Sequence, residues 1–220
     1  MAYNFDEISD NEIRKIIDAV KSLHKQNLPG IDFHSKNMLE IGSGGGFALA
    51  AFSEMGFNTT GVETCAPAAR FSAERLKQKV IHTAFEEIQV TEPYDLVFLN
   101  HVLEHFVNLN LAMAKLNERV KKSGLIYVRV PDYDSCDRRK FGKKWPAHLH
   151  FHVSYFSEKS LRILFRKYGL EVSSVKKYFS ERILPSWLKM LVRRLLHSGR
   201  SGLNGLAEGL FPKLPEKLNK

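Results

Sequence analysis

The chain is poor in cysteine and has no long apolar stretch. It holds 2 cysteines among its 220 residues, Cys65 and Cys136, and neither belongs to a Cys-x-x-Cys pair. This pattern excludes a disulfide framework and a zinc ribbon. No apolar run approaches the roughly 20 residues that cross a bilayer, and the polar segment 1–10 lacks the apolar core of a signal peptide. We therefore expect a cytoplasmic protein.

Negative charge is also scarce relative to positive charge. The chain has 33 Lys and Arg against 24 Asp and Glu, which gives a formal net charge of +9. Such an excess favours an anionic partner: nucleic acid, a phosphorylated small molecule or a membrane surface. The positive residues gather in a basic cluster of Arg138, Arg139, Lys140, Lys143 and Lys144, and in a C-terminal group of Arg182, Lys189, Arg193, Arg194 and Arg200.

Hydrophobic residues make up 44% of the chain, enough to bury a sizeable core. Their periodicity alternates between strand and helix, which indicates an α/β fold with a doubly wound, mostly parallel sheet. Strands are predicted at 37–41, 58–62, 80–81, 94–99, 125–130 and 170–175, and helices at 13–23, 47–55, 67–76, 109–120 and 157–168. The continuous apolar run Leu96–Leu99 predicts a strand that is buried on both faces.

The pattern changes near residue 180, so we expect one domain over 1–180 and an appended region over 181–220. Segment 184–197 is predicted to form an amphipathic, basic helix with Trp187 on its apolar face. Such a helix suits an anionic membrane surface, the edge of the sheet or a second subunit equally well. Beyond Ser198 we expect a loose tail.

A glycine-rich turn, Glu40-Ile41-Gly42-Ser43-Gly44-Gly45-Gly46-Phe47, follows the first strand and opens a helix. Its glycines allow a tight turn and close approach to a ligand, with main-chain N–H groups as donors. Glu63 ends the second strand about 20 residues later, where an acid can accept hydrogen bonds from ribose hydroxyls. The alternative is that the glycine-rich turn only joins the strand to the helix and binds no ligand. A dinucleotide site needs glycine where Phe47 stands, and no nucleotide-triphosphate loop is present.

The pattern Glu40-x-Gly42-x-Gly44-x-Gly46, followed by Glu63, resembles the first motif of class I methyltransferases that use S-adenosylmethionine (SAM). The resemblance implies SAM as the cofactor, with the glycine turn at its methionine part and Glu63 on its ribose. The cofactor-binding residues that it implies are Glu40, Gly42, Ser43, Gly44, Gly46, Glu63, Ala84, Phe85, Asn100 and His101. Of these, Ala84 and Phe85 are expected to flank the adenine.

Two further segments extend the resemblance over approximately residues 37–178. Segment 94–105 ends in Val-Leu-Glu-His and is similar to the family's fourth strand and the loop after it. Segment 152–157, His-Val-Ser-Tyr-Phe-Ser, resembles a stretch of a broad subgroup that often methylates sugars, polysaccharide precursors or other small molecules. The family usually ends in two antiparallel edge strands, of which we find one, near 170–178.

Histidines are the candidates for the general base, because a pKa near 6.5 suits proton removal at neutral pH. We single out His152, His105 and His150 as catalytic candidates. If segment 148–152 is extended, its three histidines point to one side. They would then form a polar wall over the acceptor, or pack beside Trp145 and Phe151. No carboxylate or cysteine has matching spacing, so no metal site is predicted.

We therefore expect O- or N-methylation of a small acceptor that is anionic or linked to a sugar or lipid. The basic cluster suits a phosphorylated or nucleotide-linked acceptor, although a solvated loop explains it equally well. Alternatives are an RNA-modifying methyltransferase and a regulatory protein that binds SAM without turnover. The sequence shows no separate RNA-binding module. Cytosine-C5 methyltransferases use a cysteine nucleophile beside a proline; here Cys65 follows the acid expected to bind the ribose, and Cys136 has no neighbouring proline, so neither cysteine fits that role.

Overall fold

The computed structural model describes residues 7–28, 34–89 and 92–177. The chain divides into two units after Val175, and the fold described below belongs to the first, Met1–Val175. The helix predicted over 184–197 and the boundary predicted at residue 180 lie outside the described residues. No helix in the described ranges is long and apolar enough to cross a bilayer. The expected cytoplasmic location stays a prediction.

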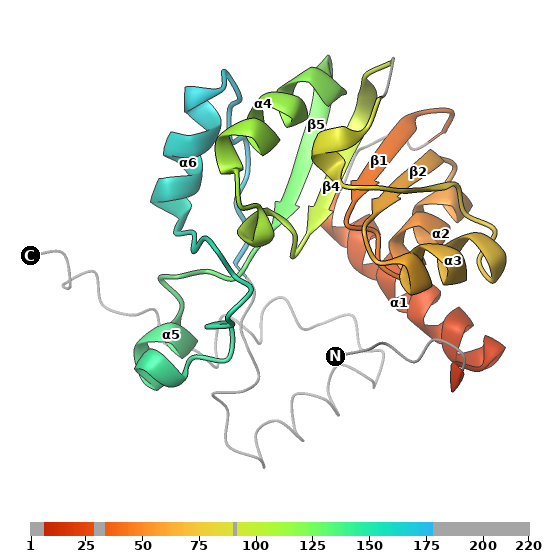
Figure 1. Cartoon of the computed structure of the whole chain (residues 1–220), viewed down its shortest axis with the longest axis horizontal. Coiled ribbons are helices and arrows are strands. Elements are labelled where there is room, and N and C mark those ends of the chain that lie inside the picture. The colour runs from red at the N-terminus through yellow and green to blue at the C-terminus, as the bar shows by residue number, and fades with distance from the viewer. Residues whose placement is uncertain (1–6, 29–33, 90–91, 178–220) are drawn as a thin grey trace, which may run out of the picture. The chain divides into compact units, whose positions relative to one another are not determined.

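A five-stranded sheet forms the centre of the first unit (Figure 1). Its strands are β1 (Asn37–Ile41), β2 (Asn58–Glu63), β3 (Val80–His82), β4 (Tyr94–Asn100) and β5 (Val120–Arg129). They lie in the order β3-β2-β1-β4-β5, and every neighbouring pair is parallel. This arrangement confirms the predicted α/β class with a parallel sheet.

The helices alternate with the strands along the chain. They are α1 (Asp10–Asn27), α2 (Phe47–Glu54), α3 (Ala66–Glu74), α4 (Leu109–Arg119), α5 (Cys136–Phe141) and α6 (Glu158–Lys167), with short 3-10 turns η2 (Phe85–Glu87), η3 (Leu103–His105) and η4 (Gly142–Lys144). Local signals set their starts: Ser9 forms a capping box with Glu12 at α1, and the Ser157 side chain accepts from the Ser160 N–H at α6. The sequence did not predict the short helix α5.

Helices cover both faces of the sheet (Figure 1). On one face, Leu96 and Phe98 of β4 pack with Met38 and Phe52, beneath α1 and α2. On the other face, a second cluster joins the alternate residues of the same strands to the buried sides of α4 and α6: Leu39, Ile41, Val97, Leu99, Met113, Leu116 and Phe165. Because β4 contributes to both clusters, its predicted burial on both faces is confirmed.

One predicted strand and one predicted strand boundary are wrong. Residues 170–175 form no strand in the described structure. Leu170 and Val172 instead pack against the core, and the Val172 carbonyl accepts a hydrogen bond from the Arg162 guanidinium rather than from a neighbouring strand. Strand β5 begins at Val120 rather than at residue 125, and a shift in its register against β4 accommodates the extra residues.

Candidate functional site

The predicted cofactor residues meet at the carboxyl edge of the sheet. The glycine turn follows β1, Glu63 ends β2, and Asn100 ends β4. Strands β1 and β4 are neighbours although two strands separate them in the chain. The sheet therefore has its topological switch point between them, which is where open α/β sheets bind their ligands.

The glycine turn is closed on two sides and open on the third. Gly42 and Gly46 have positive φ angles of 65° and 78°. A Cβ atom on Gly42 would lie 2.6 Å from Cγ2 of Val102, and one on Gly46 would collide with the hydroxyl of Ser72. Gly44 also has a positive φ, of 52°, but a Cβ there would meet no atom within 4 Å. The main chain at Gly44 is therefore free to lie against a ligand.

Two buried carboxyl groups flank this turn. The Oε2 atom of Glu63 accepts the Gly44 N–H at 2.6 Å, and its Oε1 atom accepts the Cys65 N–H at 2.7 Å. Burial raises the pKa of Glu40 well above its usual value, and the Glu63 charge raises it further. Among the described residues, neither Oε2 of Glu40 nor Oγ of Ser43 has a hydrogen-bond partner. These two buried atoms can receive donors from the amino-acid part of SAM, so the site fits that cofactor.

The residues expected beside the adenine and along β4 contribute differently. The Phe85 side chain is buried in the core, with its ring 5.9 Å from that of Phe106, so only its main chain is left to face a ligand. Asn100 is exposed at the end of β4. His101 has a positive φ of 58° and a side chain that is half exposed, with Nδ1 lying 3.3 Å from Oε1 of Glu104. Ala84 is partly buried and caps η2.

The histidine segment 148–152 is not extended, which contradicts the expected alternation. The His148 N–H donates to the Trp145 carbonyl and the His152 N–H donates to the Leu149 carbonyl, so the segment consists of turns. Its histidines therefore separate. His152 lies against His105, with 4.8 Å between ring centroids, whereas His148 and His150 are exposed. The structure brings together two of the three catalytic candidates.

Glu104 holds this pair of histidines in place and was not among the predicted site residues. Its main-chain carbonyl accepts hydrogen bonds from the N–H groups of Val153 and Ser154, at 2.9 and 3.1 Å. These bonds dock the loop that carries His152 onto η3, which carries His105. The Glu104 side chain itself is only 1% exposed. The signal available in the sequence was an acidic residue placed among the apolar residues Val102, Leu103 and Phe106.

The basic cluster lies on α5 and η4, beyond the carboxyl end of β5 (Figure 1). Arg138 packs over the ring of Tyr133 and donates to its hydroxyl, and Arg139 donates to the carbonyl of Asp134. These two arginines therefore stabilise their own loop. Lys143 and Lys144 are exposed, which leaves positive charge available to a ligand on this side of the sheet.

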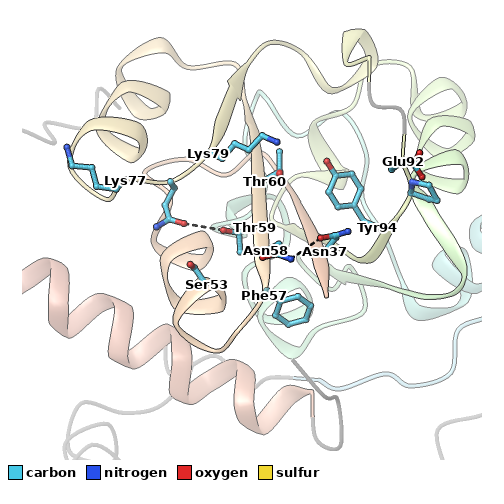
Figure 2. Close-up of a pocket in the computed structure, with 12 residues that line it drawn as sticks. Asn37, Ser53, Phe57, Asn58, Thr59, Thr60, Lys77, Lys79, Glu92 and Tyr94 are labelled. Carbon is cyan, nitrogen blue, oxygen red and sulfur yellow. Dashed lines mark hydrogen bonds between the residues drawn. The ribbon is translucent and has the colours of Figure 1, made fainter. Parts of the chain in front are cut away.

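A polar cavity of about 560 Å³ lies at the opposite edge of the sheet (Figure 2). Asn37, Asn58 and Tyr94 line it from the amino ends of β1, β2 and β4, together with Lys77 and Lys79. The Asn58 amide donates to Oδ1 of Asn37, and the Thr59 hydroxyl donates to Oε1 of Gln78. The glycine turn lies at the other ends of the same strands, so this cavity is separate from the cofactor site.

The strand order, the open glycine turn and the acid at the end of β2 together define the class I fold of SAM-dependent methyltransferases. The chain belongs to the family described as a methyltransferase domain, whose model matches residues 11–175. The prediction from the sequence is thereby confirmed at the level of family and fold.

Individual relatives agree with this assignment at low identity. A ubiquinone biosynthesis O-methyltransferase from Rickettsia typhi is 28% identical over 126 residues, covering 55% of this chain and 49% of the relative. A ubiquinone biosynthesis O-methyltransferase from Glaesserella parasuis is 24% identical, covering 42% of this chain and 44% of the relative. The chain thus spans about half the length of the curated relatives it matches.

Solved structures show the same fold. A SAM-dependent methyltransferase from Archaeoglobus fulgidus superposes with a TM-score of 0.58 at 18% identity, over 82% of this chain and 86% of the other. A methyltransferase from Haloferax volcanii, solved in a complex with the activator Trm112, gives a TM-score of 0.62 at 14% identity, over 84% and 88%.

Proposed function

We propose that the protein transfers a methyl group from SAM to an oxygen or nitrogen atom of a small acceptor. The observation that carries the proposal is the open main chain at Gly44, flanked by the buried carboxyl groups of Glu40 and Glu63. Bound SAM supplies an activated methyl group, so the protein has mainly to position the two reactants and to manage the acceptor's proton.

The cofactor-side residues would act through hydrogen bonds. Glu63 exchanges its present bond to the Gly44 N–H for the hydroxyls of the ribose, and Glu40 with Ser43 receives the amino-acid part. Ala84, Asn100 and His101 stand along the same edge and border the rest of the cofactor. Phe85 contributes its main chain only.

The acceptor would bind on the β4 and β5 side of this edge. There His105 and His152 form the pair that activates the acceptor, and Lys143 with Lys144 attracts a negative group such as phosphate. The ubiquinone biosynthesis relatives are O-methyltransferases by name, which favours oxygen as the methylated atom. An acceptor attached to a sugar, nucleotide or lipid remains compatible with this arrangement.

Calorimetric titration with S-adenosylhomocysteine, the demethylated cofactor, tests the proposal. The intact protein should bind it, and Glu63→Ala should abolish binding because the ribose acceptor is lost. Glu74→Ala is the matched control, since Glu74 is an exposed acid on α3, and it should bind like the intact protein. Absence of binding by the intact protein would refute the proposal. Binding would be followed by an acceptor screen with methyl-labelled SAM, beginning with phosphorylated sugars.

A further inference from the structure

We infer that Glu104, His105 and His152 form a binding site for one divalent transition-metal ion, such as Zn²⁺. One potential ligand atom from each of the three side chains lies within 4.8 Å of the other two. Four-coordinate Zn²⁺ holds its ligands about 2.0 to 2.1 Å away, which places them roughly 3.4 Å apart. Small side-chain rotations would close the difference.

The Glu104 side chain points to an ion because its carboxyl group is buried and has few partners. Its Oε2 atom is buried and has no hydrogen-bond partner among the described residues. Its Oε1 atom has one neighbour, Nδ1 of His101, at 3.3 Å. A buried carboxylate that lacks partners is costly, whereas one that coordinates a cation is stabilised.

Both histidines are held with the free lone pair on the same ring nitrogen. Nδ1 of His105 lies 3.1 Å from the Phe151 carbonyl oxygen, and Nδ1 of His152 lies 2.8 Å from the Ala147 carbonyl oxygen. A carbonyl oxygen only accepts, so in the neutral form of each ring Nδ1 is the nitrogen that carries the proton and Nε2 is the one with the lone pair. A metal-binding histidine usually donates the N–H of its other ring nitrogen to a carbonyl or carboxylate, and this bond fixes the orientation of the ring.

The ligand set selects the kind of ion. Two imidazoles and one carboxylate suit a borderline transition metal rather than Mg²⁺ or Ca²⁺, which prefer all-oxygen sites. Three protein ligands leave a coordination position open, as catalytic zinc sites do. His105 and His152 are both partly exposed, so an ion and a further ligand can reach the cluster from solvent.

This site deepens the proposed function and rests on it for its role. An ion beside the acceptor would lower the pKa of an acceptor hydroxyl, as it does for bound water. The proton then passes to solvent, and the oxygen lone pair forms the bond to the methyl carbon. The carbon–sulfur bond breaks with its electron pair moving to sulfur. No metal site was predicted from the sequence because segment 148–152 has no carboxylate or cysteine with matching spacing, and Glu104 lies far from that segment in the chain.

Titration of the metal-stripped, full-length protein with Co²⁺ tests the site through visible absorption, independently of activity. We expect one Co²⁺ per chain, displaced by Zn²⁺. His152→Gln and Glu104→Gln should each weaken Co²⁺ binding by about tenfold or more. His148→Gln is the control, because His148 lies in the same loop but outside the cluster, and it should bind Co²⁺ like the intact protein.

Three outcomes would overturn the inference: no Co²⁺ bound by the intact protein, binding that survives His152→Gln, or binding lost equally in His148→Gln. His152 is partly exposed, so its variant decides the question even if Glu104→Gln does not fold. S-adenosylhomocysteine binding is measured on the same samples. If it persists without Co²⁺ binding, the metal site is refuted while the methyltransferase proposal stands. If Co²⁺ binding persists without S-adenosylhomocysteine binding, the proposed function is refuted while the metal site stands.

Discussion

The buried histidine of α1 should make folding stability depend on pH. His24 is 3% exposed and lies among the rings of Phe52, Phe98 and Tyr127, with centroids 4.9 to 5.6 Å away. Burial, with a smaller effect of the Arg129 charge, lowers the pKa of His24 from 6.5 to about 4. Between pH 6.5 and pH 4, His24 therefore binds a proton in the unfolded chain but not in the folded chain, and stability falls as the pH falls toward 4.

The size of this effect follows from the pKa difference. At about 1.4 kcal/mol per pKa unit, the full loss below pH 4 is about 3 kcal/mol, of which about 2 kcal/mol is reached at pH 5. The assay is urea unfolding at pH 7 and pH 5 of the intact protein and of His24→Leu, which cannot titrate. The intact protein should lose about 2 kcal/mol more than the variant between these pH values. His148→Leu, at an exposed histidine, should behave like the intact protein. Equal losses in the intact protein and His24→Leu would refute the reasoning.

Three further predictions concern the glycine turn and the core. The raised pKa of Glu40 makes the folded chain keep a proton that the unfolded chain releases above pH 4.5, so the intact protein loses stability as the pH rises. Glu40→Gln removes this loss, and the stability of the variant relative to the intact protein should therefore be higher at pH 8 than at pH 5. Urea unfolding at the two pH values checks this, and a variant that follows the intact protein's profile would contradict it. Gly42→Ala should destabilise the fold through its clash with Val102, and adding Val102→Ala should recover part of the loss, with a coupling of about 0.5 to 3 kcal/mol in a double-mutant cycle. Strictly additive effects would disprove that contact. Leu116→Ala should cost about 2 to 5 kcal/mol in thermal or urea unfolding, since Leu116 is fully buried, and a loss under 1 kcal/mol would show that the site collapses around the gap.

The sheet could be predicted because its signals are local. Strand β1 begins and ends where predicted, since an apolar run meets a turn that only glycine permits. Strand β4 lies buried on both faces, so its apolar residues are consecutive. Helix α6 begins after Ser157, whose side chain caps it. Each of these signals lies within a few residues of the element that it defines.

The acceptor side could not be predicted in the same way because distant main-chain bonds determine it. Alternating histidines suggested an extended segment, but carbonyl groups of Trp145 and Leu149 turn the chain there. The position of His152 then depends on the Glu104 carbonyl, nearly fifty residues earlier, which binds the loop just after it. None of these bonds has a signature in residue type, since all of them use the main chain.

The topology explains why the residues proposed to hold the cofactor and those proposed to hold the acceptor lie next to each other although they are distant in the chain. From β1 the chain proceeds outward through β2 and β3, and it returns to place β4 on the other side of β1. The turn after β1 and the η3 turn after β4 therefore meet at the switch point, and the close approach of Val102 to Gly42 is their contact. Methyl transfer needs donor and acceptor in line, and this shared contact supplies a fixed reference between the residues proposed to hold each of them.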